Sequence, residues 1–550
     1  MDEKKIVLEI KQPQTLILFL FLILVLFLEL QLTLRSPIAF GDEGFYTNIG
    51  RWIAKEKEYP VWARGIGTNL LKVGFSKVPL WVMIQGGFYF IFGFSEIIVK
   101  ILTPFLLFLT GLAVYLLVKK IYSSTVALVA AILTVTIPSF VTYSVLFYPE
   151  TSFTFFISLA ILIMLLAVKT GRKKYWLLTG IFSSLTILTD TPGIVLIPFF
   201  GICFLYQLFK KRNFFNVAKN WMIVAALIIL FILPYVLRNY YFYKTPSCQL
   251  PLSIFSTSGC DIRENYKNTY NFEGSLAEGG TASPLIKFGI LSYLDFAYGF
   301  THSNEFINFI GIAFIPLTFI CGLITLFYKR SEIEALILFV LFVFIIIFYQ
   351  SLTGRVEDMA RNMIGLTAIV ALISAVYFGE VIEFTKKYHK IFPLVIIGIV
   401  LIVAFFNFKY KLDTMYSVKQ FSPLFFEACD WVKENTPKDS ILLSFHTSPT
   451  YYNCERQAQW DLPDSADIIL SQNVNLTLAR LKANGITHIF VQKFSIISQK
   501  FSAGYWIGFV QFLDSNQEKF KKAYENGPDL QTCLSQGGCD GSIIYEVIDG

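Results

Sequence analysis

The sequence predicts an α-helical polytopic membrane protein with a small C-terminal α/β extracytoplasmic domain. Three observations support this fold class. First, the 550 residues are 55% hydrophobic, 17% aromatic and 15% charged, and the mean hydropathy of +0.58 is higher than a soluble chain of this length tolerates. Second, long apolar runs alternate with short Lys and Arg clusters. Third, hydropathy falls after residue 408 and a rhythm of short helices and strands follows.

The apolar runs predict about eleven transmembrane helices, because ~20 apolar residues are needed to cross the bilayer as a helix. The first run, 16–34, has no small-residue cleavage site and is interpreted as an anchor rather than a signal peptide. The run 79–93 is short and contains two central glycines, which favours an outer-face or re-entrant helix. The remaining predicted spans are 97–118, 126–146, 152–168, 175–189, 193–209, 221–237, 306–327, 333–352, 363–384 and 391–408.

Basic residues predict the orientation of these spans. Lys4, Lys5 and Lys11 precede the first span, so the positive-inside tendency predicts a cytoplasmic N-terminus. If 79–93 does not cross, later basic clusters also fall inside: Lys119 and Lys120, Lys169 with Arg172 to Lys174, Lys210 to Arg212, Lys329 with Arg330, and Lys386 with Lys387. The prediction is a multi-pass cell-membrane protein with the lipid bilayer as partner. The dispersed clusters that give the +7 net charge do not indicate nucleic-acid binding.

This orientation divides the chain into a transmembrane domain, 1–408, with outer loops 35–78 and 238–305, and an extracytoplasmic α/β domain, 409–550. Within the second domain the pattern predicts helices at 423–434 and from 476 to a stop at Asn484 and Gly485. It also predicts strands at 441–445, 486–492 and from 542.

Cysteine usage agrees with an oxidising outer compartment. Cys203 and Cys321 lie within predicted spans, and the other six cysteines lie in the outer segments. Proximity favours the pairs Cys248–Cys260, Cys429–Cys454 and Cys533–Cys539, although six cysteines allow 15 connectivities. Free buried thiols are the alternative.

Carboxylates recur at the predicted outer face. Asp42 and Glu43 follow the first span, Glu150 begins a later one, and Asp190 lies between two others. Each also has a purely structural explanation: Asp42 and Glu43 as a helix start, Glu150 as a first-turn acid, and Asp190 as a turn residue. Their coincidence at one membrane boundary, on separate connections, is the arrangement expected if they converge on a site.

Cations lie on the same predicted face. Lys77 precedes the short apolar run, and Arg355 and Arg361 occupy a tight outer loop. A guanidinium group donates two parallel hydrogen bonds to a phosphate, and Lys supplies a point charge. Interfacial snorkelling is the alternative for each. Carboxylates and cations together, beside lipid, predict a polar reaction on a lipid-linked phosphate.

These features resemble the C-type (GT-C) glycosyltransferases, in particular enzymes related to dolichyl-phosphate-mannose protein mannosyltransferases (glycosyltransferase family 39) and lipid A aminoarabinose transferases. The resemblance covers about 16–209 and rests on the outer loop GDEGFY, the K-x-P-L step at Lys77 to Leu80, a short helix ending in IFGFSE, and the later outer acid in YPE. Val78 stands where the family motif K-P-P-L has its first Pro. The chain has no W-W-D-Y-G run, which argues against an oligosaccharyltransferase.

The resemblance implies transfer of a sugar from a polyprenyl (dolichyl) phosphate to a hydroxyl of a protein, glycan or lipid acceptor on the outer face. It implies Asp42 as general base, with Glu43 beside it and Tyr46 completing a D-E-x-x-Y pattern, and Lys77 as a phosphate contact. Inversion follows if the attack is one in-line displacement. Glu150 could position the acceptor or, with Asp42, hold a divalent metal, which the sequence does not require; Asp190 belongs to the same candidate group.

Two other functions fit a polytopic chain. A transporter or flippase should carry ionisable residues in mid-span or an inverted repeat, whereas Glu29, Lys100, Glu380 and Glu383 are predicted to lie towards span ends, where snorkelling suffices. A non-catalytic glycolipid-binding protein would retain the fold and lose the chemistry of Asp42.

Overall fold

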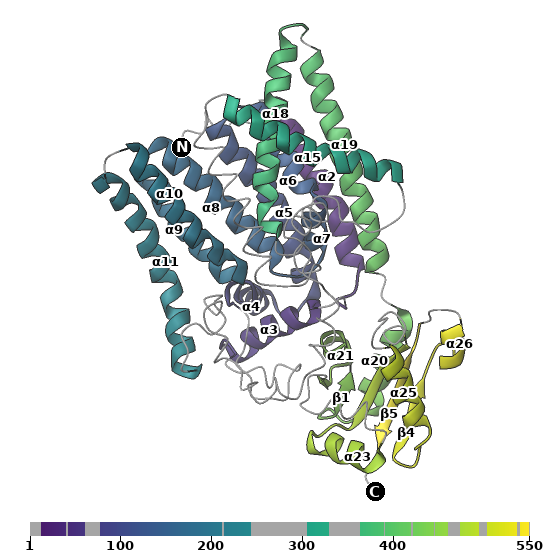
Figure 1. Cartoon of the computed structure of the whole chain (residues 1–550). Coiled ribbons are helices and arrows are strands. Elements are labelled where there is room, and N and C mark those ends of the chain that lie inside the picture. The colour runs from purple at the N-terminus through teal and green to yellow at the C-terminus, as the bar shows by residue number, and fades with distance from the viewer. Residues whose placement is uncertain are drawn as a thin grey trace.

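The computed structural model of the chain is a helical bundle with a smaller α/β region at one end (Figure 1). The structure describes residues 13–39, 42–60, 78–211, 214–243, 305–328, 363–389, 391–419, 422–444, 446–459, 473–493, 503–535 and 540–548. Within these ranges seven helices are long and apolar enough to cross a membrane, or up to eight if the bent pair α6 and α7 is one span. The predicted helical membrane bundle with a small C-terminal α/β region is confirmed. The extracytoplasmic position of that region and the number eleven stay predictions, and the predicted span 333–352 lies outside the described residues.

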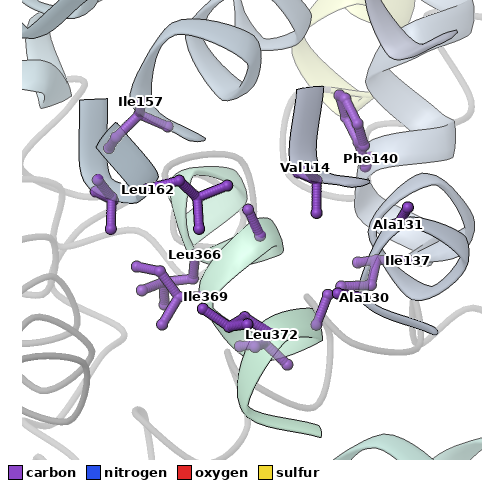
Figure 2. Close-up of a cluster of buried hydrophobic side chains, with 14 of the residues drawn as sticks. Val114, Ala130, Ala131, Ile137, Phe140, Ile157, Leu162, Leu366, Ile369 and Leu372 are labelled. Carbon is purple, nitrogen blue, oxygen red and sulfur yellow. The ribbon is translucent and has the colours of Figure 1, made fainter. Parts of the chain in front are cut away.

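The described bundle helices are α2 (Pro13–Arg35), α5 (Glu96–Ile121), α6 (Ser124–Thr136), α7 (Pro138–Val145), α8 (Glu150–Thr170), α9 (Lys173–Thr189), α10 (Leu196–Lys211), α11 (Phe214–Tyr243), α15 (Glu305–Tyr328), α18 (Thr367–Lys386) and α19 (Phe392–Val418). Helix α6 lies inside the bundle, and every residue from Val126 to Thr136 is buried. Figure 2 shows its small side chain Ala130 beside Leu372 of α18, with Val114 of α5 in the same cluster. Small residues let helix axes approach closely in a membrane, where apolar burial alone gives no preference for protein over lipid.

Contacts between helices define two ends of the bundle. Near the start of α2, Thr15 hydrogen-bonds Tyr115 near the end of α5 (2.8 Å between hydroxyls), and Lys169 at the end of α8 donates to the carbonyl of Ile121 (2.7 Å). The backbone of Gly379 on α18 approaches Val126 at the start of α6. These contacts bring Lys119, Lys120, Lys169 and Lys386 to one end, called here the basic end. The start of α8, with Glu150, lies at the other.

The predicted single span 126–146 is broken in the structure. Helices α6 and α7 meet at Ile137 with a bend of 56°, and Ile137 has extended backbone angles (φ −61°, ψ 124°). The cause is Pro138, whose ring disfavours helical geometry in the residue before it. The bend directs α7 towards Tyr148 and Glu150.

An amphipathic helix and a short apolar helix lie at the end opposite the basic end. Helix α3 (Glu43–Glu56) packs on α4 (Leu80–Phe92), and Figure 1 shows both at this end of the bundle, with α3 extending towards the C-terminal region. The two helices approach closely because each has a glycine at the contact, Gly50 on α3 and Gly86 on α4. A Cβ on Gly50 would lie 2.9 Å from the Gln85 side chain, and one on Gly86 would lie 2.7 Å from Ile53. One of the two central glycines of the short apolar run is therefore required for packing against α3.

Helix α19 continues past residue 408, where the sequence predicts the end of the last span, to Val418. Leaving an apolar environment does not end a helix when no Gly or Pro intervenes. The extension brings Lys419 back towards the start of α3. The C-terminal α/β region follows with α20 (Pro423–Asn435).

The C-terminal region contains five described strands in the order β2-β1-β3-β5-β4. They are β1 (Ile441–Ser444), β2 (Gln457–Gln459), β3 (His488–Gln492), β4 (Phe520–Glu525) and β5 (Ser542–Val547). Strand β1 pairs in parallel with β2 and β3, whereas β5 pairs antiparallel with β3 and β4. The predicted helix 423–434 and the strands starting at 441 and 542 are confirmed, and the predicted strand 486–492 begins slightly later, at His488.

Helices cover both faces of this sheet. Ile489 and Val491 of β3 pack with residues of α23 (Val474–Ala483) and α25 (Ala503–Asp514). Phe490, which points to the opposite face, packs with α20 and with α21 (Thr447–Cys454). A disulfide between Cys429 and Cys454, with an S–S distance of 2.05 Å, joins α20 to α21. The short α26 (Leu530–Ser535) precedes β5.

Candidate active site

Asp42 lies immediately before α3 at the end of the bundle opposite the basic end. It is half-buried, and its backbone N–H donates to the hydroxyl of Tyr148 (2.9 Å). Its side chain makes no capping hydrogen bond to α3, so the capping role that the sequence offered for Asp42 is not observed. Tyr148 stands two residues before Glu150, so the contact brings two of the predicted acidic connections together.

Glu43 is fully buried and forms an ion pair with Lys419. Its Oε1 accepts from Lys419 Nζ at 2.7 Å, and its Oε2 accepts from the backbone N–H of Ala39 at 3.3 Å. Lys419 also donates to the carbonyl of Val145 (2.8 Å) and lies 4.2 Å from the ring centroid of Phe147. Burial lowers the pKa of Lys419, and the Glu43 carboxylate acts in the opposite direction.

The other predicted acids lie at the same end. Glu150, the first residue of α8, is buried, and Asp190 follows the last residue of α9. Helices α8 and α9 are joined by a short loop and pack along their length, so the start of α8 and the end of α9 lie near each other. Tyr46 is buried on α3, and its ring centroid is 6.0 Å from that of Tyr148.

A second polar network joins the C-terminal region to the bundle at this end. The Tyr452 hydroxyl on α21 donates to Glu96 (2.7 Å) and accepts from Arg51 of α3 (2.9 Å). Glu96 also pairs with Lys100 one turn along α5 (3.0 Å). Burial raises the pKa of Tyr452, so the hydroxyl keeps the proton that it donates to Glu96.

A pocket of about 470 Å³ lies beside this network, between the end of α2, the start of α5 and α20. Arg35 and Lys100 line it from the bundle, and Glu427 and Asp430 line it from α20. Asp42 and Glu150 are not among its lining residues, so this pocket is separate from the predicted acidic pair.

Some of the predicted site residues and cysteines belong to segments outside the described part of the chain. Lys77, Arg355 and Arg361 lie outside the described residues, as do Cys248, Cys260 and Cys539. Cys429 and Cys454 form the pair expected from proximity, and Cys533 is also disulfide-bonded. Within the described ranges, no group of three or more His, Cys, Asp or Glu side chains is arranged to hold a metal ion.

The sequence did not indicate Lys419, named Tyr148 only as part of the YPE motif without a role, and gave Glu29 the wrong environment. Lys419 follows an apolar run like many other lysines, and no local pattern marks it. Glu29 was predicted to lie towards a span end and to snorkel, but it is fully buried, and Ser144 of α7 donates to its Oε1 at 2.5 Å. The snorkelling interpretation of Glu29 is wrong, because the broken span brings α7 against this part of α2.

The fold is that of known C-type glycosyltransferases. AglB, an archaeal oligosaccharyltransferase from Archaeoglobus fulgidus solved with a tethered acceptor peptide, matches with a TM-score of 0.64 at 14% identity, over 97% of this chain and 74% of AglB. ArnT from Cupriavidus metallidurans, solved with undecaprenyl phosphate, matches with a TM-score of 0.60 at 11% identity, over 97% of this chain and 98% of ArnT. The mycobacterial arabinofuranosyltransferase AftD matches with a TM-score of 0.55 at 12% identity, over 96% of this chain and 40% of AftD.

A family model also matches part of the sequence. Residues 76–237 match the model described as dolichyl-phosphate-mannose-protein mannosyltransferase. No curated protein matches the chain significantly by sequence. The matched segment begins next to Lys77 and includes Glu150 and Asp190. The chain therefore has the C-type glycosyltransferase fold, and one segment of it is similar to the mannosyltransferase family.

Proposed function

We propose that this multi-pass membrane protein is a glycosyltransferase that moves a sugar from a polyprenyl phosphate to an acceptor hydroxyl on the outer face, with Asp42 as general base. The proposal includes a cytoplasmic N-terminus and an extracytoplasmic domain 409–550. The matched family model and the shared fold support the class of reaction. The residues around Asp42 support the assignment of the base.

One observation carries the proposal: the contact between Asp42 and Tyr148. It joins the start of α3 to the connection that leads into Glu150 (2.9 Å), at the end of the bundle away from the clustered lysines. Under the positive-inside tendency the lysines face the cytoplasm, so Asp42 faces outward at the membrane boundary. A lipid phosphate presents its sugar at that depth.

The proposed reaction is a single displacement. The acceptor oxygen forms a bond to the anomeric carbon while the bond between that carbon and the phosphate oxygen breaks. The acceptor proton goes to the Asp42 carboxylate, and the electron pair of the broken bond leaves on the polyprenyl phosphate. Attack opposite the leaving phosphate inverts the anomeric carbon. A positioned base contributes about 10²- to 10⁴-fold to the rate of such a step.

Cations stabilise the charge that develops on the leaving phosphate. We assign this role to Lys77, Arg355 and Arg361, on the chemistry of their side chains and their predicted outer position. Glu150, Asp190 and Tyr46 are assigned to positioning the acceptor. A divalent metal held by Asp42 and Glu150 is compatible with their hard oxygen donors.

The acceptor is proposed to be a hydroxyl group rather than an Asn amide. AglB is an oligosaccharyltransferase by its description, but this chain shares only its fold and has no W-W-D-Y-G run. The assay described below, with a panel of hydroxyl acceptors, distinguishes a protein, glycan or lipid acceptor.

The first prediction concerns Asp42→Asn. Purified protein in lipid is incubated with a panel of polyprenyl-phosphate sugars and hydroxyl acceptors, and released polyprenyl phosphate is measured by mass spectrometry. Because an amide cannot take the acceptor proton, Asp42→Asn should lower turnover by about 10²- to 10⁴-fold. Asp439→Asn, an exposed site after α20, should leave turnover unchanged.

Equal turnover of Asp42→Asn and wild type would remove Asp42 as the base. No released polyprenyl phosphate from the wild-type protein with any donor would favour a non-catalytic glycolipid-binding protein. Transport of intact lipid without sugar transfer would favour a flippase.

A further inference from the structure

Lys419 connects three separated parts of the chain at the start of α3. It follows α19, and its ammonium group bonds the Glu43 carboxylate and the carbonyl of Val145 at the end of α7, at 2.7 and 2.8 Å. The side chains of Lys419 and Glu43 are 1% and 0% exposed. The ring of Phe147 lies against the ammonium group and excludes water from it.

A pair buried this deeply is weak evidence for stability. Removing two charges from water costs several kcal/mol per ion, and attraction between them often does no more than offset that cost. Exposed lysines on α19 illustrate the contrast, since Lys409 pairs with Asp413 in solvent. A desolvated pair instead restricts geometry, because separating the two groups would leave two buried charges without their partners, which is strongly unfavourable in free energy.

The geometry that this pair restricts is that of Asp42. Glu43 is the first residue of α3 and Asp42 is the residue before it. Glu43 Oε2 also accepts from the backbone of Ala39, which fixes the chain on the other side of Asp42. The third restraint is the Tyr148 hydroxyl on the backbone of Asp42. Tyr148 and Val145 belong to the same connection between α7 and α8.

We infer that Lys419 is a positioning residue: through the buried ion pair with Glu43 it holds the start of α3 against the α7–α8 connection and so orients Asp42. Glu43 then acts as an anchor, with both carboxylate oxygens engaged, while Asp42 meets substrate. This inference rests on the proposed function, because it assigns the two adjacent acids different parts in the same reaction. It also makes the start of the C-terminal region part of the site, since α20 begins four residues after Lys419.

The variants separate orientation from folding. Lys419→Met removes the charge at similar length and leaves Glu43 buried without its cation. The double variant Glu43→Gln/Lys419→Met removes both charges, so no charged group is left buried without its partner. Lys419→Arg keeps the charge and the donors. Lys409→Met removes an exposed ion pair on the same helix and is the matched control.

Turnover is expressed per folded molecule, taken from the monodisperse fraction in lipid nanodiscs. Lys419→Met and the double variant should each lower kcat by about 100-fold, because displacement of a reacting group by about 1 Å has that effect. The KM for the lipid donor should change little, since both side chains are buried and bonded within the protein. Lys419→Arg should recover a substantial part of kcat, and Lys409→Met should equal wild type.

A second measurement needs no substrate. Hydrogen exchange of the amides at the start of α3 should be faster in Lys419→Met and in the double variant than in wild type and Lys409→Met. Exchange in β3, which is remote from the pair, should be the same in all four proteins. This readout remains informative if the wild-type protein transfers no sugar, so failure of the proposed function and failure of this inference give different results.

Three outcomes overturn the inference. A folded double variant with wild-type kcat would show that the pair does not orient the base. Unchanged exchange at the start of α3 in both charge-removing variants would show that Lys419 does not hold that segment. If Glu43→Gln lowers kcat by as much as Asp42→Asn while exchange is unchanged, Glu43 takes part in the chemistry directly.

Discussion

Adjacent acids in this chain have different surroundings. Asp42 is half-buried at the start of α3, whereas Glu43 is sealed in an ion pair with Lys419. Glu29 differs again, because its nearest polar partner is the neutral hydroxyl of Ser144 (2.5 Å), and its Oε2 has no hydrogen-bond partner among the described residues. Composition does not distinguish these three carboxylates, whereas their burial and their hydrogen-bond partners do.

The contact between Glu29 and Ser144 leads to a stability prediction. Ser144→Ala should lower the free energy of unfolding by about 1–3 kcal/mol, because it leaves a buried carboxyl group without a donor. Adding Glu29→Leu should restore most of the loss, since replacing both partners with apolar groups is nearly neutral. Thermal unfolding of the protein in detergent measures both.

Ser183→Ala is the control for this pair. The Ser183 hydroxyl is buried on α9 and has no hydrogen-bond partner within the described ranges, so its removal should not destabilise the protein. Additive effects of Ser144→Ala and Glu29→Leu would contradict the predicted coupling.

Helix α3 brings the bundle and the C-terminal region together. It packs on α4 along Gly50 and Gly86, and on α21 along Gly44. A Cβ at Gly44 would lie 2.8 Å from the carbonyl oxygen of Ser448 and 2.9 Å from Cβ of Tyr452. The amphipathic sequence of α3 predicts an interfacial helix, and its glycines explain how closely it approaches both neighbours.

Gly44→Ala should therefore separate α3 from α21. The new methyl group meets backbone, which cannot rotate away, and overpacking of this kind costs about 1–3 kcal/mol. The melting temperature and the activity should both fall. Gly87→Ala, at a position of α4 where an added Cβ would meet no neighbouring heavy atom within 4 Å, should be neutral or slightly stabilising. Similar melting temperatures for both variants would argue against the tight contact.

The whole molecule combines a membrane bundle with an α/β region docked on one end. Arg51, Glu96 and Tyr452 form the central polar contact, and Asn453 adds a hydrogen bond to the carbonyl of Ile38 (3.1 Å). The Tyr452 hydroxyl bonds residues of both α3 and α5. The C-terminal region therefore contacts α3, the helix that follows Asp42.

Tyr452→Phe should loosen this docking while keeping the ring that lies over Arg51 (4.6 Å). The loss of hydrogen bonds to two charged groups should cost about 1–3 kcal/mol, and limited proteolysis after α19 should release a C-terminal fragment that begins near α20 more quickly. Tyr451→Phe, at the neighbouring half-buried position of α21, should behave like wild type. Equal cleavage of both variants would show that Tyr452 does not secure the interface.

Local patterns in the sequence indicated most of the apolar bundle helices that the structure describes, the helix 423–434 and the strands beginning at 441 and 542, because burial in lipid or in a sheet face imposes a regular apolar period. They did not indicate the break between α6 and α7. They also indicated Asp42, Glu150 and Asp190 as acids at one face, since connections alternate between the two sides of a membrane. Local patterns did not give the short strands β2 and β4, which depend on their neighbours for pairing.

Only the tertiary structure shows which side chains contact one another. Glu43 meets Lys419 across 376 positions of sequence, and that meeting depends on where α19 ends and on how Pro138 bends α7. Glu29 is buried for the same reason. An apolar period reports which residues avoid water, but a buried ion pair depends on the packing of distant helices, and no local period encodes it.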